Sequence, residues 1–240
     1  MPDQIPTFLR RQSFQPGLLG LFFNPFFFIR RNLYTHIRRT APLLKGRLLD
    51  FGCGRKPYEN LFSSVSEYVG LDMEQTGHNH RNSKVDVFYD GKHIPFPDES
   101  FDALFCGEVL EHVFDPELVL PEIRRVLKRD ATALLTVPFC WNEHEIPFDY
   151  ARYSTFGIKY LLEKHGFEVL EVQRSGNFVQ VNFQLWALYF YELFKGLGTT
   201  GKLLSMLFII PINVIGSLLR MLLPKNDSLY FNSIITAKRS

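Results

Sequence analysis

The chain is poor in cysteine and nearly neutral in net charge, and each feature excludes a class of protein. Its three cysteines, Cys53, Cys106 and Cys140, are widely separated and form no Cys-x-x-Cys pair. This spacing excludes the disulfide framework of a small secreted domain and predicts reduced, buried packing residues in a cytoplasmic protein. The formal net charge is only +2, so no overall basicity indicates nucleic-acid binding.

Targeting and repeat signals are also missing. The proline-broken apolar run after Arg10 and Arg11 has no clean hydrophobic region and no cleavage site, so we expect no secretory signal peptide. We find no internal repeat and no low-complexity tract. With 46% apolar residues, a chain of 240 residues can bury a full core, which predicts one globular catalytic domain with additional segments.

The most informative segment is the run from residue 47 to residue 54, where an apolar strand leads into a glycine turn. Asp50 follows the leucines at the carboxyl end of the predicted strand, the edge where open α/β sheets bind ligands. Gly52 and Gly54 let the backbone approach a ligand closely, although an ordinary tight turn also explains such a pair taken alone. Pro57 stands where a pyrophosphate-binding turn has its third glycine, which disfavours a nicotinamide oxidoreductase.

Three more strand-like segments follow, and two of them end in a carboxylate. The segments are Tyr68–Asp72, Val85–Asp90 and Phe101–Cys106. Asp72, at the end of the second strand, is placed to accept hydrogen bonds from ribose hydroxyls. Acids often cap loops and helices, which explains each of them singly. The ordered series Asp50, Asp72 and Asp90 instead predicts a nucleotide-like ligand.

In their order and spacing these segments resemble the class I S-adenosylmethionine-dependent methyltransferases, most closely the type 11 branch with a ubiquinone/menaquinone-methyltransferase-like domain. The matching runs are Leu48–Gly54, Gly70–Asp72, Asp90–Gly91, Ile94–Asp102, Glu108–Val113, Leu118–Leu127 and Ala133–Pro138. The resemblance covers roughly residues 46–172. It implies a Rossmann-like α/β fold, in which a seven-stranded, mostly parallel sheet with an antiparallel last strand forms an α/β/α sandwich.

The resemblance also implies a binding site for S-adenosyl-L-methionine. The glycine turn would surround the methionine part, Asp72 would bind the ribose and Asp90 would reach the adenine amino group. Glu108 would lie near the methionine end, and residues 110–112 would begin the next helix. The cofactor-binding residues implied are Asp50, Gly52, Cys53, Gly54, Asp72, Met73, Asp90, Gly91 and Glu108. Many family members have a third glycine in this turn; we interpret the residues 55–58 found here as a subfamily mark.

The segment 137–154, after the fifth predicted strand, is dense in groups that can hold or deprotonate a methyl acceptor. Methyl transfer is a direct displacement, and a hydroxyl acceptor benefits from a base. His144 is our first candidate for that base and His112 the second, although either can simply orient a loop or helix through a hydrogen bond. The predicted substrate-binding residues are Asn142, Glu145, Asp149, Tyr150, Arg152 and Tyr153.

Two further interpretations of this segment concern the role of Arg152, which the sequence leaves open, and a zinc site, which it disfavours. Arg152 can pair with a carboxylate or phosphate of the acceptor, or form a structural ion pair with Asp149 or Glu145. A zinc site of the His-Glu-x-x-His type would need a second histidine where Phe148 stands, so we expect no metal site.

The two ends of the chain are unusually apolar. Residues 14–34 combine aromatic side chains with flanking arginines, which is typical either of a segment in the lipid headgroup region or of a helical lid. Residues 178–223 form a second apolar region, whose later part keeps its polar side chains near one helical face. Those polar residues are Ser205, Asn213, Ser217 and Arg220. We interpret this region as an in-plane membrane attachment or an acceptor channel, with a dimer interface as the alternative.

These observations predict four segments: an apolar arm at 1–45, the methyltransferase core at 46–177, a helical insertion at 178–225 and the final strand of the sheet at 226–240. We expect a methyltransferase on the cytoplasmic side, peripheral on the inner face of the membrane, that modifies oxygen or carbon of a small-molecule or lipid-linked acceptor. The alternative is a catalytically silent, cofactor-binding scaffold on the membrane. The sequence does not predict the oligomeric state.

Overall fold

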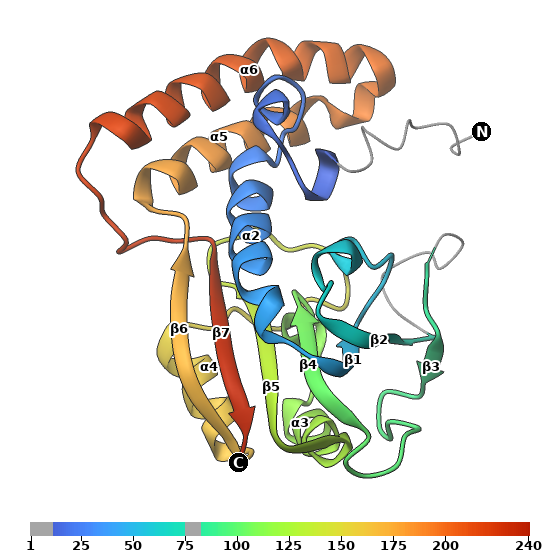
Figure 1. Cartoon of the computed structure of the whole chain (residues 1–240). Helices are drawn as coiled ribbons and strands as arrows, with labels where there is room; N and C mark the ends of the chain where they lie inside the picture. Colours follow the sequence, from blue (N-terminus) through green and yellow to red (C-terminus); the bar gives the residue numbers. More distant parts are fainter. Residues whose placement is uncertain (1–11, 75–82) are drawn as a thin grey trace. The chain divides into compact units, whose positions relative to one another are not determined.

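The computed structural model describes residues 12–74 and 83–240, which divide into two compact units. The sheet unit comprises residues 37–174 and 232–240. The helical unit comprises the described residues before Ile37 together with residues 175–231. The N-terminal segment and the final strand thus belong to different units, and the chain enters the helical unit for a second time between its last two strands (Figure 1).

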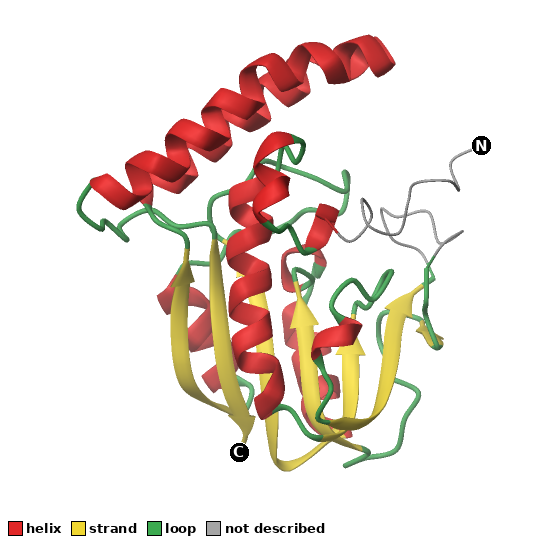
Figure 2. Ribbon diagram, turned by 45° about the horizontal axis from the view of Figure 1, so that its top comes forward, coloured by secondary structure: helices red, strands yellow, loops and turns green. Residues whose placement is uncertain are grey.

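The sheet unit contains a seven-stranded sheet with the order β3-β2-β1-β4-β5-β7-β6. The strands are β1 (Gly46–Phe51), β2 (Val65–Met73), β3 (Val87–Tyr89), β4 (Phe101–Gly107), β5 (Leu127–Pro138), β6 (Phe167–Ser175) and β7 (Asn232–Arg239). Strands β1 to β5 pair in parallel, and β7 runs antiparallel to β5 (Figure 2). The predicted fold class is confirmed. The strand order reverses between β1 and β4, the point at which open α/β sheets form a ligand crevice.

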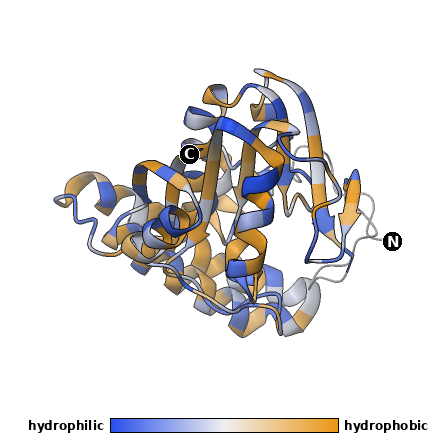
Figure 3. Ribbon diagram, turned by 90° about the horizontal axis from the view of Figure 1, so that it is seen from below, coloured by the Kyte–Doolittle hydropathy of each residue, from blue (hydrophilic) through white to orange (hydrophobic). Residues whose placement is uncertain are grey.

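Buried apolar strands and two amphipathic helices make the core of this unit. Helices α3 (Pro116–Val126) and α4 (Thr155–Lys164) pack on one face of the sheet, where Ile123 and Leu162 are fully buried. The hydropathy colouring in Figure 3 shows the central strands as largely apolar. Side-chain caps begin both helices: Asp115 accepts from the Glu117 amide and Ser154 from the Gly157 amide. The sheet unit also contains the short 3-10 helices η2 (Ala41–Leu43), η3 (Glu59–Leu61) and η5 (Leu110–His112).

The helical unit is built on two long antiparallel helices. It contains η1 (Leu18–Phe22), most of α2 (Phe27–Thr40), α5 (Phe178–Phe194), η6 (Lys195–Leu197) and α6 (Gly198–Leu222). Phe190 of α5 stacks on Phe208 of α6 with 4.2 Å between ring centroids. At its entry and exit, the Phe231 amide donates to the Ser175 carbonyl at 2.8 Å, so the two ends of the excursion are tied together.

Two buried amide side chains fasten the N-terminal segment to these helices. The Oε1 atom of Gln184 accepts from the amides of Phe28 and Ile29 at 3.0 and 3.3 Å, and its Nε2 atom donates to the Pro25 carbonyl. Asn213 donates to the carbonyls of residues 21 and 24 at 3.1 and 3.2 Å. Both side chains are fully buried, so these bonds stabilise the unit by satisfying backbone groups that water cannot reach.

The helical unit exposes many apolar side chains along α5 and α6. The polar face of α6 exists, but Ser205 and Asn213 on it are buried, while leucines point outward. The exposed large apolar side chains of the two helices include Trp186, Leu193, Leu203, Leu207, Leu218, Met221 and Leu222. Among the described residues, the helical stretch Phe178–Leu222 is long and apolar enough to cross a membrane by length and composition alone.

Candidate functional site

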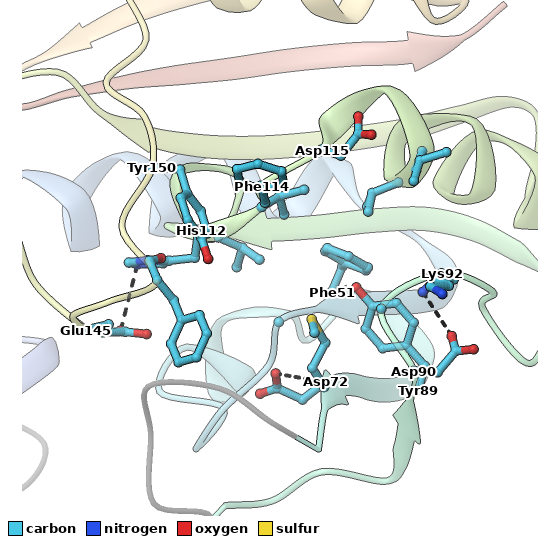
Figure 4. A pocket seen from close by; sticks show the side chains of 18 of the residues that line it. Phe51, Asp72, Tyr89, Asp90, Lys92, His112, Phe114, Asp115, Glu145 and Tyr150 are labelled. Atoms are coloured by element: carbon cyan, nitrogen blue, oxygen red, sulfur yellow. Dashed lines mark hydrogen bonds and ion pairs between the residues drawn. The ribbon is translucent and has the colours of Figure 1, made fainter.

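A cavity of about 380 Å³ opens in the sheet unit at the carboxyl ends of the parallel strands. Its walls come from the segments that follow β1, β2, β3, β4 and β5. Because all five strands run in parallel, the loops after them meet at one edge of the sheet. In Figure 4, Asp72, Tyr89, Asp90 and Lys92 lie on one side of the cavity, and His112, Glu145 and Tyr150 lie on the other.

The glycine turn after β1 is bonded directly to the end of β2. The Gly54 amide donates to Asp72 Oδ2 at 2.9 Å, and the Met73 amide donates to Asp72 Oδ1 at 2.8 Å. Gly52 and Gly54 have φ values of +72° and +49°, a region that favours glycine. A Cβ on Gly52 would lie 2.4 Å from the Val109 side chain, whereas one on Gly54 would meet no described residue within 4 Å. Of the two glycines, only Gly54 therefore lies beside open space, and the hydrogen bond to Asp72 fixes the shape of the turn.

Asp50 and Cys53 lie behind this cradle and do not line the cavity. The Tyr68 hydroxyl donates to Oδ2 of the buried Asp50 at 2.6 Å. Burial raises the pKa of Asp50 to about 7, although the hydrogen bond from Tyr68 acts in the opposite direction. The Cys53 side chain packs against Gly70, and burial raises the pKa of its thiol. The structure thus gives both residues supporting positions.

Asp90 and Gly91 form the rim of the cavity after β3. Asp90 Oδ1 accepts from the amides of Lys92 and His93, both at 2.9 Å, and these two bonds lower the pKa of the Asp90 carboxyl. A Cβ on Gly91 would lie 2.9 Å from Met73 Cε, so the absence of a side chain lets Met73 reach this wall. Asp90, Gly91 and Met73 all line the cavity, where the resemblance placed them.

Glu108 lines the cavity from the end of β4, in a backbone conformation that is rare for a residue with a side chain (φ +58°). The Thr136 hydroxyl donates to its Oε1 atom at 2.8 Å, and the Asn232 amide group donates to its Oε2 atom at 2.7 Å. Donors from β5 and β7 therefore hold the carboxylate in place.

The next residues correct one detail of the prediction. Residues 110–112 do not begin the following helix; they form the separate turn η5, and α3 starts at Pro116 after its Asp115 cap. The turn directs the His112 ring to the cavity wall, where Nδ1 lies 2.7 Å from the Phe148 carbonyl. Glu111 is fully buried behind it. Burial, with the charge of Glu108 as a second cause, raises the pKa of Glu111 well above its usual range.

The loop after β5 divides the predicted acceptor residues into two sets. Glu145 and Tyr150 line the cavity, together with His112 from the other loop. The predicted residues that do not line it are Asn142, His144, Asp149, Arg152 and Tyr153. His144 packs edge-on against His112 with 4.7 Å between ring centroids. The first of the two candidate bases is thus one layer behind the cavity, and the second is at its surface.

Arg152 and Asp149 form the structural ion pair that the sequence analysis left open. The guanidinium nitrogens donate to both Asp149 oxygens at 2.6 Å. Burial alone would raise the pKa of Asp149, but the bonds from Arg152 and the His144 amide outweigh it and lower the pKa to about 2. His144 Nδ1 lies 3.1 Å from Asp149 Oδ2. Burial and the neighbouring His112 lower the pKa of His144, which favours its neutral form.

Several cavity-lining residues were not predicted from the sequence, and four of them are aromatic. They include Phe51, Tyr89, Phe114 and Phe148. Phe51 and Tyr89 stand at or next to predicted strand ends, which was the available signal, whereas Phe114 and Phe148 lie further along the loops that follow. Together they give the cavity flat apolar walls suited to an aromatic ring.

The composition of the cavity fits S-adenosylmethionine better than a phosphate-bearing cofactor. Five carboxylates line it, from Asp72, Asp90, Glu108, Asp115 and Glu145. Among the described residues in its lining, the basic side chains are a single lysine, at position 92, and His112. Such a lining attracts a sulfonium and an ammonium group and repels a pyrophosphate. The residues present therefore fit the cofactor that the resemblance implies.

Comparison with known proteins gives an independent line of support. A methyltransferase domain model matches residues 49–135. A probable S-adenosylmethionine-dependent methyltransferase of Mycolicibacterium smegmatis is 27% identical over 147 residues, covering 59% of this chain and 55% of that protein. An O-methyltransferase of Penicillium expansum is 25% identical over 194 residues, covering 69% and 65%. The chain spans about half the length of the first curated relatives that it matches.

Solved structures share the fold at low sequence identity. A methyltransferase structure from Aquifex aeolicus has a TM-score of 0.53 and 16% identity, covering 97% of both chains. One from Archaeoglobus fulgidus has a TM-score of 0.53 and 19% identity, covering 98% of this chain and 100% of that one. With its strand order, its glycine cradle and these matches, the chain resembles the class I S-adenosylmethionine-dependent methyltransferases, and residues 49–135 match their methyltransferase domain.

Proposed function

We propose that the protein transfers a methyl group from S-adenosylmethionine to an oxygen or carbon of a small-molecule or lipid-linked acceptor. The observation that carries the proposal is the cradle in which Gly54 faces the cavity and its amide is bonded to Asp72. This arrangement places an open backbone turn and a carboxylate where a nucleoside with an aminoacyl chain fits. One curated relative is an O-methyltransferase, which supports an oxygen acceptor.

The residues of the cavity divide the work of binding and alignment. When bound, S-adenosylmethionine supplies an electrophilic methyl group on a sulfonium. Asp72 accepts hydrogen bonds from the ribose hydroxyls, and Asp90 meets the adenine at the rim. Glu108, held by Thr136 and Asn232, offers negative charge beside the cationic end. The protein's main task is to align the acceptor behind the methyl group and to exclude water.

The acceptor end of the cavity is the wall formed by His112, Glu145, Phe148 and Tyr150. Phe148 and Tyr150 are only partly buried, so this wall is accessible to a ligand. Their rings can pack against an apolar or aromatic acceptor, while His112 and Glu145 supply polar groups beside the reacting atom. The mixture of aromatic and polar groups suits a substrate that carries one nucleophilic atom on an apolar body.

Calorimetric titration with S-adenosylhomocysteine tests the cofactor. We expect micromolar binding by the wild-type chain, a large loss in Asp72→Ala and no loss in Glu67→Ala, a matched acid on the exposed part of the same strand. NADH should not bind. Absence of binding by a folded wild-type protein would refute both the methyltransferase and the cofactor-binding scaffold, whereas binding without methyl transfer to any acceptor would favour the scaffold. If the cofactor binds, transfer of a labelled methyl group into lipid extracts would identify the acceptor class.

We further propose that the helical unit attaches the protein to a lipid surface on the cytoplasmic side. Large apolar side chains, Leu203, Leu207 and Met221 among them, point outward from α6, and Lys202 and Arg220 lie on the same helix. An apolar face with basic residues and a nearby aromatic residue, Trp186, is typical of helices that lie in the headgroup region.

Vesicle flotation tests this attachment. The wild-type chain should float with vesicles that contain anionic lipid, and Leu203→Ser/Leu207→Ser should reduce the bound fraction. Leu170→Ser, at a half-exposed leucine of β6, is the matched control and should bind as the wild type does. Equal binding by both variants, or a concentration-dependent dimer that the α6 variant abolishes without any vesicle binding, would refute the membrane proposal.

A further inference from the structure

Three side chains that can bind a metal ion meet at the acceptor end of the cavity, although they come from two separate segments of the chain. Glu111 and His112 come from η5, and His144 comes from the loop after β5. One ligand atom from each lies within 4.8 Å of the others. The Glu111 carbonyl accepts from the amides of Tyr150 and Ala151 at 2.8 and 3.2 Å, which ties the two loops together.

Both histidines are oriented as metal-binding histidines are. His112 Nδ1 faces the Phe148 carbonyl at 2.7 Å, and His144 Nδ1 faces Asp149 Oδ2 at 3.1 Å and the Asn142 carbonyl at 3.3 Å. All these partners are acceptors, so in each neutral ring Nδ1 carries the proton and Nε2 keeps its lone pair. A carboxylate or carbonyl on one nitrogen is the usual outer partner of a histidine that binds metal through the other.

Glu111 supplies the second, independent observation. Its side chain is fully buried, and beyond the amide of Glu111 itself neither carboxylate oxygen has a hydrogen-bond partner among the described residues. Oε1 lies 3.8 Å from His112 Nε2, which also lacks a hydrogen bond, and Glu145 Oε1 lies 3.8 Å from the same nitrogen. A buried carboxyl without a partner is costly, and a cation at this point would satisfy it together with the histidine.

We propose that Glu111, His112 and His144 bind one divalent first-row metal ion, such as Zn²⁺ or Mn²⁺, beside the acceptor end of the cavity. Two imidazoles and one carboxylate form a donor set suited to such ions. Metal–ligand bonds of about 2.1 Å place neighbouring donor atoms roughly 3.4 Å apart in a tetrahedron. Each of the three donor atoms would therefore move toward the ion by about 1 Å or less on binding. A His-Glu-x-x-His motif would place the second histidine at position 148, whereas in the proposed site His112 comes from another loop.

Three protein ligands leave at least one coordination position of the ion open. Because His112 and the neighbouring Glu145 line the cavity, this position would lie at the cavity wall. If the proposed methyl transfer holds, an acceptor hydroxyl bound there would lose its proton more readily, and neither histidine would need to act as the base. This role depends on the proposed function, whereas the binding of the ion does not.

Cobalt provides a direct test, because protein-bound Co²⁺ with few ligands has visible d–d absorption. The full chain, stripped with EDTA and dialysed, is titrated with Co²⁺ alone. We expect one ion per chain, at least tenfold weaker binding in Glu111→Gln and in His144→Ala, and unchanged binding in His93→Ala, a matched exposed histidine beside Glu122. Asp149→Asn should weaken binding about 10- to 100-fold through His144.

Two outcomes would overturn the metal site: an absence of stoichiometric Co²⁺ binding by folded wild-type protein, or an equal loss in His93→Ala. If Glu111→Gln does not fold, His144→Ala decides, since its ring is partly exposed. Titration with S-adenosylhomocysteine on the stripped protein separates the two proposals. Cofactor binding without Co²⁺ binding would overturn the metal site alone, whereas Co²⁺ binding without cofactor binding would support the metal site and refute the methyltransferase.

Discussion

Gly54 offers a way to block the cofactor site at small cost to the fold. In Gly54→Ala the new methyl group would meet no atom of the described residues within 4 Å, so the energetic cost arises from the backbone, whose φ is +49°. A left-handed conformation costs an alanine roughly 1–2 kcal/mol, which in a chain of this size lowers Tm by about 2–8 °C. The same methyl group projects into the cavity beside Asp72, where the cofactor must lie. We expect at least tenfold weaker binding of S-adenosylhomocysteine, or about 1.4 kcal/mol.

Gly198 provides the matched control for this experiment. It also has a left-handed φ, +59°, and open space around its Cβ position, but it lies at the start of α6 and not in the cavity lining. Because the ψ of Gly198 is −132°, a region that side chains avoid, Gly198→Ala should lower Tm at least as much as Gly54→Ala and leave the affinity unchanged. Calorimetry and thermal unfolding of both variants measure the two effects separately. Wild-type affinity in Gly54→Ala, or an equal loss of affinity in Gly198→Ala, would show that the cradle does not bind the cofactor.

Three further outcomes follow from the charges and the buried amides. Asp50→Asn should weaken cofactor binding far less than Asp72→Asn. Because the folded pKa of Asp50, about 7, lies above its ordinary value, the free energy of unfolding of the wild type should decrease as the pH rises from about 4 to 7. The Asn variant should lose that pH dependence in urea unfolding. Bonds from Arg125 lower the pKa of Glu122 to about 2, so Glu122→Gln should cost about 2 kcal/mol at pH 7 after allowance for solvent screening, and the difference should disappear as the pH falls from about 4.5 to 2. Gln184→Leu leaves two buried amides without their acceptor and should destabilise the helical unit by about 2–4 kcal/mol, seen as faster proteolysis near Phe28. Asn182→Leu, at a partly exposed position of the same helix, should not.

The sequence predicted the sheet and the cavity well because strand ends are local features. An apolar run followed by an acid or a glycine marks the carboxyl end of a buried strand, and parallel strands bring such ends together. The same reasoning could not tell which side of the sheet edge a side chain faces. Asp50 was therefore predicted in the cradle, while the structure turns it toward Tyr68 and leaves the cavity wall to Phe51.

Sequence periodicity cannot predict contacts between segments that are far apart in the chain. The period of α6 located its polar face, but whether Asn213 on that face meets water or another segment depends on residues 21–24, almost 190 positions earlier. His112 and His144 likewise meet because two strand-end loops converge, and a search for metal ligands within one helix or loop cannot find such a pair.

The hydrogen bond between Phe231 and Ser175 affects how the helical segment can tolerate changes of sequence and length. Since the two ends of the excursion are held together, residues 176–230 close a loop of 55 residues, the difference between 230 and 175. Loop-closure entropy rises by only about 0.6 kcal/mol per doubling, so this long loop costs roughly 2 kcal/mol more than a turn of five residues. Insertions and deletions in the excursion are therefore cheap for the sheet, and the helices can diverge to suit a new acceptor or surface while the cofactor cradle stays as it is.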